Sequence, residues 1–559
     1  MEYTLGLDFG TGSVRACILD IYSGQMMATA VCPFTGGVEG TYRDPHNPLL
    51  ARQSPMGYLR SLEKAVCKAV ENFEREGFDV KNIIGIGVDA TGSTPIPVKQ
   101  NLQPLEALPA YKNNLNAYAW LWKDHTAVNE ALAITQKAAA THPQYLDKCG
   151  GTYSSEWFWS KAWHCLNTDP QVFEAADSWI EQSDFIPATL AGIEDVSQVK
   201  RNICAAGHKA MYSETWGGLP GKEFLASLHP ALADLRDRLY DTAYSFDETM
   251  GELSTEWAAR LGIPGGIPVA VGALDAHVGA VGAGVGQGKF VKIIGTSTCD
   301  IMAFPKSKAP GDFPGVAGIV DGSVLPGHIG IEAGQAAVGD LLNWWVQHVL
   351  KKGAEYHIEL TEKASQLKAG ESGLLALDWN NGNRNILGDQ QLSGLILGQT
   401  LASADYEIYR ALIEATAFGA LKIIKLLENQ GIEIREIITT GGIGHKNELF
   451  MQVYADIIGY PVKRVQNPQT VAIGAAIMAA VAVKKGKEGF TDLDKVVENL
   501  SVASDKTYTP NPEAHAVYQQ LFSLYNKLHD AFGQDREIKL YQVMKTLIDL
   551  RNEITNNRY

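Results

Sequence analysis

The stretch Leu5-Gly-Leu-Asp-Phe-Gly-Thr-Gly-Ser-Val-Arg15 opens the chain, and a degenerate copy follows half a chain later as Val291-Lys-Ile-Ile-Gly-Thr-Ser-Thr-Cys-Asp300. Each copy is a short apolar run with strand character, which a Gly-Thr pair interrupts before the chain can resume as a strand. A glycine turn lets successive backbone N–H groups point into one concavity, and Thr or Ser hydroxyls add donors, which suits a chain of phosphates. The repeat predicts two related lobes that face each other across a nucleotide.

The first copy also contains Asp8 beside its turn, where a carboxylate could hold a hydrated magnesium ion. Other interpretations of the glycines are weaker. Arg15 stands where a dinucleotide-binding fingerprint has its third glycine, and no Gly-Lys-Ser/Thr follows as it would in a Walker loop. A single Gly-Thr hairpin is more often an ordinary turn, so the prediction depends on the repeat, on Asp8 and on a third motif, Thr440-Gly-Gly-Ile-Gly444.

The length and the charge of the chain limit how many domains it can form and which partners it can bind. A chain of 559 residues is too long for one core and should form two large domains. The net charge is −15, with 45% hydrophobic and 20% charged residues and no basic tract. Binding of nucleic acid or of an anionic membrane needs clustered Lys and Arg, so neither is an expected partner. An anionic nucleotide can still bind through backbone amides.

Cysteine usage and the N-terminus indicate the compartment. The seven cysteines are scattered and include no Cys-x-x-Cys pair, which argues against a cysteine zinc site or a disulfide framework and for a reducing environment. Met1-Glu-Tyr3 lacks the basic start of a signal peptide, and the longest apolar run, Val471–Val483, is too short to span a bilayer. We therefore expect a cytoplasmic protein.

Periodicity and turn signals outline the elements of the first half. Strands are expected over 3–7, 14–20, 26–31 and 83–88, and helices over 55–75, 120–141 and 155–166. Another strand should end at Ala273-Leu-Asp-Ala-His277, which precedes five closely spaced glycines between 279 and 288. We interpret these glycines as close helix packing followed by a hinge, with plain small-residue packing as the alternative.

The second half should begin with a strand over 290–294 and contain another over 437–440 before a series of helices. Residues 511–559 are polar and helix-rich, and we expect them to brace the surface. The Gly-Gly pair of Thr440-Gly-Gly-Ile-Gly444 follows a strand and precedes a helix, so a flat ring such as adenine could approach its backbone.

Asp275 lies at a strand end between the two halves, the usual place for a ligand-facing group in an open α/β sheet. A helix N-cap is the alternative role for this aspartate. No dense cluster of carboxylates is evident along the chain, so magnesium should be held mainly through water and phosphate oxygens.

Together, Asp8-Phe-Gly-Thr-Gly12, Asp275, Gly295-Thr-Ser-Thr298 and Thr440-Gly-Gly442 resemble the FGGY family of carbohydrate kinases, within the actin-like ATPase superfamily. The resemblance runs in order from residue 3 to about residue 485. It implies an α/β fold of two actin-like (ribonuclease H-like) lobes with an active-site cleft between them. The lobes would span 1–286 and 287–559, the second including the helical tail 511–559.

The resemblance also implies the nucleotide site, with ATP and Mg²⁺ as cofactors. Asp275 is similar to the family's general base, which takes the proton from the attacking sugar hydroxyl. Asp8 is similar to the residue that orients Mg–ATP, and it is the expected metal ligand. The remaining nucleotide contacts implied by the family are Gly10, Thr11, Gly12, Gly295 and Thr296 around the phosphates, and Gly339, Asn343, Gly442 and Asn447 around adenosine.

Within the family, six segments most closely resemble the members that phosphorylate L-ribulose. They are Val88-Asp-Ala-Thr-Gly-Ser-Thr-Pro95, Trp122-Lys-Asp-His-Thr-Ala127, Gly150-Gly-Thr-Tyr-Ser-Ser-Glu-Trp157, Ala206-Gly-His-Lys209, Trp216-Gly-Gly-Leu-Pro220 and Gly330-Ile-Glu-Ala-Gly-Gln335. The implied reaction is conversion of L-ribulose to L-ribulose 5-phosphate in L-arabinose breakdown. The implied sugar contacts are Ser93, Trp122, Lys209, Asp275 and Glu332.

Each of these assignments has an ordinary structural alternative. A lysine such as Lys209 is normally solvated, and Trp122 could simply pack in a core. His125, His208 and His277 are expected to be structural, because the reaction needs no second base.

Other functions on the same scaffold stay open from the sequence. The kinase could act on D-ribulose, xylulose or another polyol, since fold alone does not choose a substrate. An actin-like ATPase that serves as a chaperone, filament or sensor would share the phosphate turns but would not need a carboxylate at Asp275. A homodimer is the assembly that the family resemblance suggests.

Overall fold

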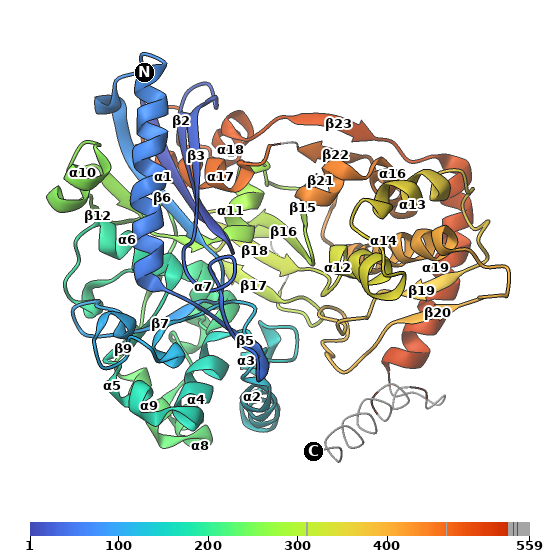
Figure 1. Ribbon diagram of the computed structural model, residues 1–559, viewed down its shortest axis with the longest axis horizontal. Coiled ribbons are helices and arrows are strands. Elements are labelled where there is room, and N and C mark those ends of the chain that lie inside the picture. Colours follow the sequence, from blue (N-terminus) through green and yellow to red (C-terminus); the bar gives the residue numbers. More distant parts are fainter. Residues whose placement is uncertain (309–310, 466, 535–539, 541–544, 546–559) are drawn as a thin grey trace.

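The computed structural model describes residues 1–559 except 309–310, 466, 535–539, 541–544 and 546–559, and it places two seven-stranded sheets side by side (Figure 1). The first sheet has the order β12 (Thr249–Glu252), β13 (Pro268–Ala270), β6 (Ile83–Ala90), β1 (Tyr3–Phe9), β2 (Ser13–Asp20) and β3 (Met26–Pro33), with β14 (Ala273–Leu274) also paired to β6. The second has the order β17 (Gly318–Asp321), β18 (His328–Ala333), β16 (Thr298–Pro305), β15 (Lys289–Ile294), β21 (Glu436–Thr440), β22 (Val462–Val465) and β23 (Ser504–Tyr508).

The two sheets share one topology. In the first, β1 forms an antiparallel hairpin with β2 and runs parallel to β6, which runs parallel to β13, and β12 is antiparallel to β13. In the second, β15 makes the same hairpin with β16 and runs parallel to β21, which is followed by parallel β22 and antiparallel β23. The sequence repeat is therefore a repeat of folded structure, which confirms the expected pair of related lobes.

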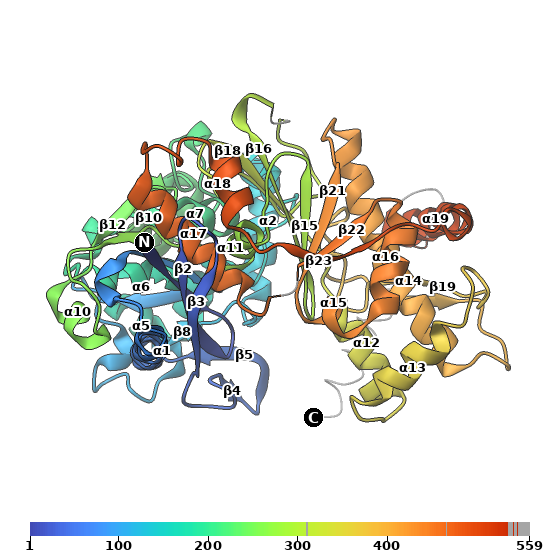
Figure 2. The same cartoon turned by 90° about the horizontal axis from the view of Figure 1, so that it is seen from above.

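Two helices, α11 (Asp275–Gly282) and α17 (Thr470–Lys484), lie between the sheets, as the view from above shows (Figure 2). Helix α17 packs closely against α11 on one side and against β1 on the other, because glycines lie at both contacts. A Cβ added to Gly282 would lie 1.9 Å from the Thr470 carbonyl oxygen, and one added to Gly6 would lie 1.9 Å from that of Ala472. The apolar run 471–483 is thus a buried helix, and no helix of the described residues is long and apolar enough to cross a membrane.

Helix α1 (Pro55–Arg75) covers the outer face of the first sheet and has the predicted bounds. The Ser54 hydroxyl accepts a hydrogen bond from the Gly57 amide and caps the helix, and Pro55 supplies a first-turn residue that needs no amide partner. The apolar spacing that begins at Leu59 and Leu62 is buried against β2 and β3.

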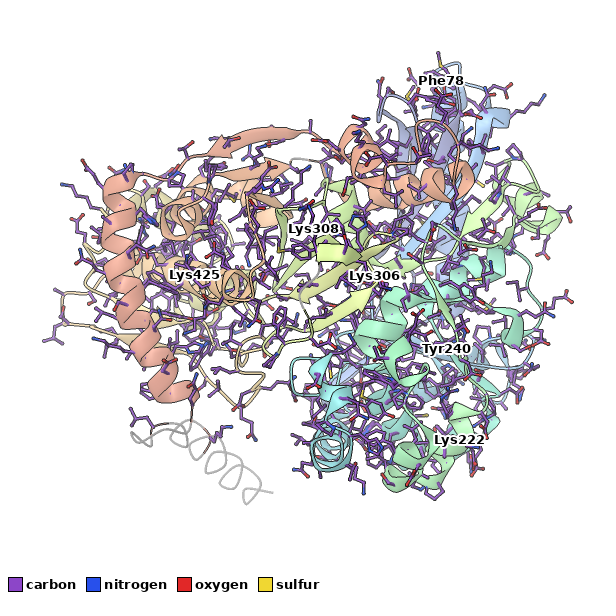
Figure 3. The ribbon with its side chains drawn as sticks, turned by 180° about the vertical axis from the view of Figure 1, so that it is seen from behind. Phe78, Lys222, Tyr240, Lys306, Lys308 and Lys425 are labelled. Atoms are coloured by element: carbon purple, nitrogen blue, oxygen red, sulfur yellow. The ribbon has the colours of Figure 1, made fainter. Side chains whose placement is uncertain are left out.

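A helical part with its own core is inserted in the first lobe. Its helices are α2 (Val128–Thr141), α3 (Gln144–Asp147), α4 (Phe158–Thr168), α5 (Pro170–Ala175), α7 (Ile203–Lys209), α8 (Lys222–Leu228) and α9 (Pro230–Arg236), whereas α6 (Gln182–Leu190) and α10 (Thr255–Leu261) pack into the core of the first sheet. Its short strands are β4 (Tyr42–Asp44), β5 (Asn47–Gln53), β7 (Pro95–Val98), β8 (Ala119–Trp120), β9 (Ser178–Glu181), β10 (Arg201–Asn202) and β11 (Ala243–Tyr244). Figure 3 views the molecule from behind, with Tyr240 and Lys222 labelled in this helical part and Lys306 labelled in the second lobe. Helix α7 of the helical part packs on β17 of the second sheet.

The expected helix over 120–141 is wrong in its first part, because α2 begins only at Val128. The preceding residues form β8 and a turn around Asp124, whose buried carboxylate pairs with Arg52 and accepts a hydrogen bond from the Ala51 amide. This long-range pairing outweighs the helical spacing of the apolar residues.

The second lobe is covered by α12 (Gly339–Asn343), α13 (Tyr356–Ala364), α14 (Asp405–Asn429), α15 (Gly442–Lys446), α16 (Glu448–Ile458), α18 (Leu493–Leu500) and α19 (Pro512–Gly533), with a small ladder of β19 (Leu375–Leu377) and β20 (Leu395–Leu397). Helix α19 lies on the outside of the lobe, as the expected surface brace would, and Tyr518 and Tyr525 on its inner face are fully buried in the lobe's core. The Tyr518 hydroxyl accepts from Arg410 and donates to Glu414. The rest of the tail lies largely outside the described residues.

Candidate active site

Three aspartates meet at the edge of the first sheet. The parallel register of β1 and β6 sets Asp8 beside Asp89, and β14, which pairs with β6 at the same level, leads directly into Asp275 at the start of α11. Among the described residues these three aspartates do not bring their oxygens together as one group that could hold a metal ion, so the expectation of no dense carboxylate cluster is not contradicted. Asp89 was missed because only the pairing of β1 with β6, two strands far apart in the chain, brings it to Asp8, and nothing local in the sequence indicates that pairing.

Asp8 and Asp89 are 2% and 0% exposed, and their partners differ. Arg15, the cross-strand neighbour of Asp8, donates to its carboxylate at 2.8 Å. Neither carboxylate oxygen of Asp89 has a hydrogen-bond partner among the described residues. Burial, with the nearby charges of Asp8 and Asp275, raises the pKa of Asp89 well above its ordinary value.

Asp275 is the first residue of α11, with Leu274 in the N-cap position, so the carboxylate does not serve as the cap. Its Oδ1 accepts a hydrogen bond of 2.8 Å from the Ala276 amide. Desolvation by the surrounding protein and the charge of Asp8 raise the pKa of Asp275 to about 7. A carboxylate with such a pKa can take up a proton near neutral pH, which is what a general base requires.

The first phosphate turn, Gly10-Thr11-Gly12, lies just beyond β1, and its Thr11 is held from two sides. The Gln53 side chain donates to the Thr11 carbonyl at 2.6 Å, and the Trp122 indole N–H donates to the Thr11 hydroxyl at 3.0 Å. Trp122 is only partly buried, so it is not simply a core residue. The segment predicted to contact sugar thus contacts the turn predicted to hold phosphate.

The second phosphate turn, Gly295-Thr296, is exposed. Backbone amides at the start of α12 donate hydrogen bonds to it. The Thr296 carbonyl accepts from the amides of Val338 and Asp340 at 2.8 and 3.1 Å, and the Gly295 carbonyl accepts from the Gly339 amide at 3.2 Å. A Cβ on Gly339 would lie 2.6 Å from the Gly295 oxygen, so only glycine fits there without a shift. Gly339 therefore shapes this turn.

Two of the four predicted adenosine residues, Asn343 and Asn447, lie on one chain of hydrogen bonds. His357 is hydrogen-bonded to the side-chain Oδ1 of Asn343 at 3.1 Å and to the Tyr409 hydroxyl at 3.0 Å, and the Asn447 side-chain amide donates to the Tyr409 hydroxyl at 3.4 Å. Asn447 also caps α16. Gly442 has no described atom within 4 Å of a Cβ built on it, so its face is open for a ring to approach.

The predicted sugar residues Lys209 and Glu332 form a buried pair between α7 and β18. The Lys209 ammonium donates to both Glu332 oxygens at 2.9 Å and lies 5.5 Å from the Trp157 ring centre. Lys209 is therefore not a solvated surface lysine. Burial disfavours the charged form of each residue, but the charge and hydrogen bonds of its partner favour that form more strongly. The net effect lowers the pKa of Glu332 and raises the pKa of Lys209.

Ser93 is separate from this pair. Its side chain is wholly buried and its hydroxyl donates to Glu181, while the buried Lys161 ammonium donates to the Ser93 carbonyl at 2.8 Å. In this arrangement Ser93 fixes the loop after β6, with its hydroxyl already in use. The sequence did not single out Glu156 and Arg384, whose Oε1 and guanidinium nitrogen lie 3.9 Å apart. The charge of Glu332 also raises the pKa of Arg384, so Arg384 lies near the Lys209–Glu332 pair.

Comparison with known proteins identifies the family of the chain. Residues 3–282 match the N-terminal domain, and residues 290–483 the C-terminal domain, of the FGGY family of carbohydrate kinases. A protein of Halalkalibacterium halodurans named ribulokinase is 38% identical over 99% of this chain and 98% of its own, and one of Shouchella clausii with the same name is 39% identical over 99% and 98%. The structure of a xylulose kinase from Rhodospirillum rubrum shares the fold, with a TM-score of 0.76 at 21% identity over 95% of this chain and 99% of that one. The chain therefore belongs to the FGGY family of carbohydrate kinases.

Proposed function

We propose that this ATP-dependent sugar kinase transfers the γ-phosphoryl group of ATP to L-ribulose and gives L-ribulose 5-phosphate, a step of L-arabinose breakdown. One observation supports the proposal above the others. The register of β1, β6 and β14 places Asp275, the first residue of α11, next to Asp8 and the first phosphate turn, and the charges of the buried Lys209–Glu332 pair also act on it. A base at this position lies between the groups proposed for phosphate and those proposed for sugar.

In the proposed reaction Asp275 accepts the proton of the C5 hydroxyl of the sugar. The freed oxygen forms a bond to the γ-phosphorus as the bond from that phosphorus to the ADP oxygen breaks. Gly10, Thr11 and Gly12 on one side, with Gly295 and Thr296 on the other, would donate to the phosphate oxygens. Such donors stabilise the charge on the transferred group, where most catalysis of phosphoryl transfer arises.

The residues at the first turn suit Mg²⁺, which prefers carboxylate oxygens and water. Asp8 would hold the ion, and Asp89, whose two buried oxygens have no partner among the described residues, is a second oxygen donor beside it. When bound with ATP, magnesium neutralises charge on the phosphates. Arg15 shares the Asp8 carboxylate, so it would have to yield an oxygen to the ion or to its water.

Adenosine would lie between the open face of Gly442 and the chain that joins Asn343 to Asn447. Gly339 would contribute by keeping the second turn in place rather than by a side-chain contact.

The sugar would contact Lys209, Glu332 and Trp122, with Ser93 keeping the neighbouring loop in position. Lys209 and Glu332 satisfy one another in this structure, so a sugar that enters must replace or extend their bonds with its own hydroxyl and carbonyl groups. A sugar without the matching groups would leave a buried charge unpaired, at a cost of about 1–3 kcal/mol or more per group. Polar sites of this kind discriminate strongly between related substrates.

Coupled release of ADP tests the function across L-ribulose, D-ribulose, both xyluloses, ribitol and a sample without sugar. We expect the highest kcat/KM with L-ribulose and a product phosphorylated at C5, which phosphorus NMR identifies. A preference for xylulose or D-ribulose would establish the kinase activity but contradict the assigned substrate. ATP hydrolysis that is indifferent to every sugar would instead support a non-metabolic actin-like ATPase.

Two expectations about the whole protein stay predictions. A homodimer would give twice the chain mass in light scattering, and a cytoplasmic location would be seen by fractionation of the cells that express the protein.

A further inference from the structure

We propose that His208, His277 and Glu332 form a second cation site, which binds a zinc-like transition-metal ion and is distinct from the magnesium that accompanies ATP. The three residues come from α7, α11 and β18, and all three are buried. Neither the proposed phosphate transfer nor the proposed sugar contacts use the two histidines.

The spacing of the ligand atoms suits a small tetrahedral ion. His208 Nδ1 lies 3.4 Å from Glu332 Oε2, and His277 Nε2 lies 3.6 Å from the same oxygen. One nitrogen or oxygen atom from each residue falls in a group in which all atoms are within 4.8 Å of one another. Zinc bonds of about 2.0–2.2 Å at tetrahedral angles place neighbouring ligand atoms roughly 3.3 Å apart. The observed contacts to Glu332 are close to that value.

The histidines are in the state that coordination requires. His208 Nδ1 and both ring nitrogens of His277 are buried and have no hydrogen-bond partner among the described residues. Polar atoms buried in this way cost free energy unless a ligand satisfies them. His208 Nε2 lies 3.0 Å from the Ser323 hydroxyl, an outer bond of the kind that fixes the ring of a metal-bound histidine.

The chemistry of the donors selects the ion. Two imidazoles and one carboxylate are a ligand set that zinc takes in proteins, with a fourth position left for water or a substrate atom. Magnesium prefers oxygen ligands and keeps several waters, so this pocket suits it poorly. Asp8 and Asp89 offer only carboxylate oxygens, which suit magnesium, so the two sites differ in the class of metal that they favour.

Glu332 connects the site to the sugar pocket. Its Oε2 faces the histidines and also accepts from Lys209, whereas Oε1 contacts Lys209 at 2.9 Å. An ion on Oε2 would compete with Lys209 for that oxygen and would place a second positive charge beside the ammonium. Zinc should therefore weaken binding of the ketose, a consequence that depends on the proposed function.

The site also joins the two halves of the chain. His208 and His277 belong to the segment matched by the N-terminal family domain, and Glu332 to that matched by the C-terminal one. An ion that binds only the folded arrangement of all three raises stability in proportion to the logarithm of its concentration above Kd. Zinc should thus raise the melting temperature of the protein without any substrate.

Direct binding tests the proposal independently of catalysis. The full chain is freed of metal with a chelator, and Zn²⁺ is titrated against a chromophoric chelator without ATP or sugar. We expect one tight site and a rise in melting temperature. His277→Gln and His208→Gln, each checked for native circular dichroism, should weaken this site by about 100-fold or more, beyond the loss caused by removing an outer partner. The matched control His46→Gln, at an exposed histidine, should bind as the wild type does.

Cobalt(II) in place of zinc shows whether the bound metal is held by cysteines, one of which, Cys67, is exposed. The proposal predicts visible cobalt absorption without a thiolate charge-transfer band, and loss of that absorption in His277→Gln. A thiolate band, or equal zinc affinity in the wild type and both folded histidine variants, would overturn it. In kinetics, zinc should raise the apparent KM for the sugar at least several-fold with little change in kcat; an unchanged KM in wild-type protein with the site filled would overturn the link to the sugar pocket.

Discussion

The two phosphate turns stand at the ends of equivalent hairpins, yet their charges are arranged in opposite ways. In the first lobe, the strand ends in Asp8, which faces Asp89 and Asp275 across the sheet edge. In the second lobe, the equivalent strand ends in Ile293 and Ile294, and no carboxylate takes the place of Asp8.

The charges of the second lobe lie beneath its turn and neutralise one another. The Lys292 ammonium is wholly buried and donates to both oxygens of Asp300 at 2.9 and 3.0 Å, and to Gln335 at 2.9 Å. The Gln335 amide donates to Asp378, which accepts from Tyr525 of α19. This turn therefore presents hydroxyl and amide donors on a rigid base. Under the proposed function, the second lobe would hold phosphate, while the base and the metal would belong to the first.

The largest expected effect is the loss of the base. Asp275→Asn keeps the shape of the side chain but removes its ability to accept a proton, so kcat should fall by about 10²–10⁴-fold. Calorimetric titration should still detect binding of L-ribulose and of ATP. The control Asp340→Asn, an exposed carboxylate beside the second turn, should stay near wild-type rates. Equal losses in both variants would break the proposed division between the lobes.

A smaller loss is expected at the first turn when its metal ligand is removed. Asp8→Asn should lower kcat/KM at fixed Mg²⁺ on the order of 100-fold, and added Mg²⁺ should restore part of it. Thr296→Val in the second turn should also slow the reaction, but added Mg²⁺ should not restore it. The test is a magnesium titration of both variants. Identical magnesium dependence in Asp8→Asn and the wild type would show that Asp8 does not hold the ion.

The sugar pair should affect one substrate only. Lys209→Met and Glu332→Gln should each raise the KM for L-ribulose at least ~10-fold, with little change in the KM for ATP, because each leaves a buried partner unpaired. Their preference for L-ribulose over other pentuloses should also decline. The double variant should raise the KM for L-ribulose by less than the product of the two single effects, since the two residues form one pair. Wild-type sugar kinetics in both variants would place the pocket elsewhere.

The smallest effect concerns stability. The folded protein raises the pKa of Asp275 from an ordinary value near 4 to about 7, so ionisation of this group costs stability as the pH rises through that interval. Asp275→Asn lacks this cost. It should melt about 1–3 °C above the wild type at pH 8, and the difference should vanish near pH 4. A variant that melts below the wild type at pH 8 would contradict the raised pKa.

Much of the fold could be predicted because its signals are local. The bounds of α1 follow from a capping serine, a proline and an apolar period, and the two hairpins follow from their Gly-Thr turns. The helix expected to begin at residue 120 failed because Arg52 and Asp124 pair across a distance that periodicity does not register. The surface position of α19 could be expected, but the tyrosines that anchor it, such as Tyr518, could not, because they pack on residues far away in the chain.

The candidate site divides in the same way. Residues on recognisable motifs, such as Thr11, Lys209 and Asp275, could be named from the sequence. Asp89 could not be assigned a role, because its importance comes from the register of β1 and β6. The unpaired nitrogens of His208 and His277 likewise depend on three elements that meet only in the folded chain.

The pH dependence of kcat/KM for L-ribulose tests the central claim most directly. It is measured with Mg–ATP well below its KM, so that the profile reports on ionisations of the free enzyme. A base on the first lobe must be ionised to accept the sugar proton, and the pKa of Asp275 is about 7. The account predicts that kcat/KM falls tenfold per pH unit below a limb near pH 7 and levels off above it. A profile that stays level from about pH 5.5 to 9 would contradict it.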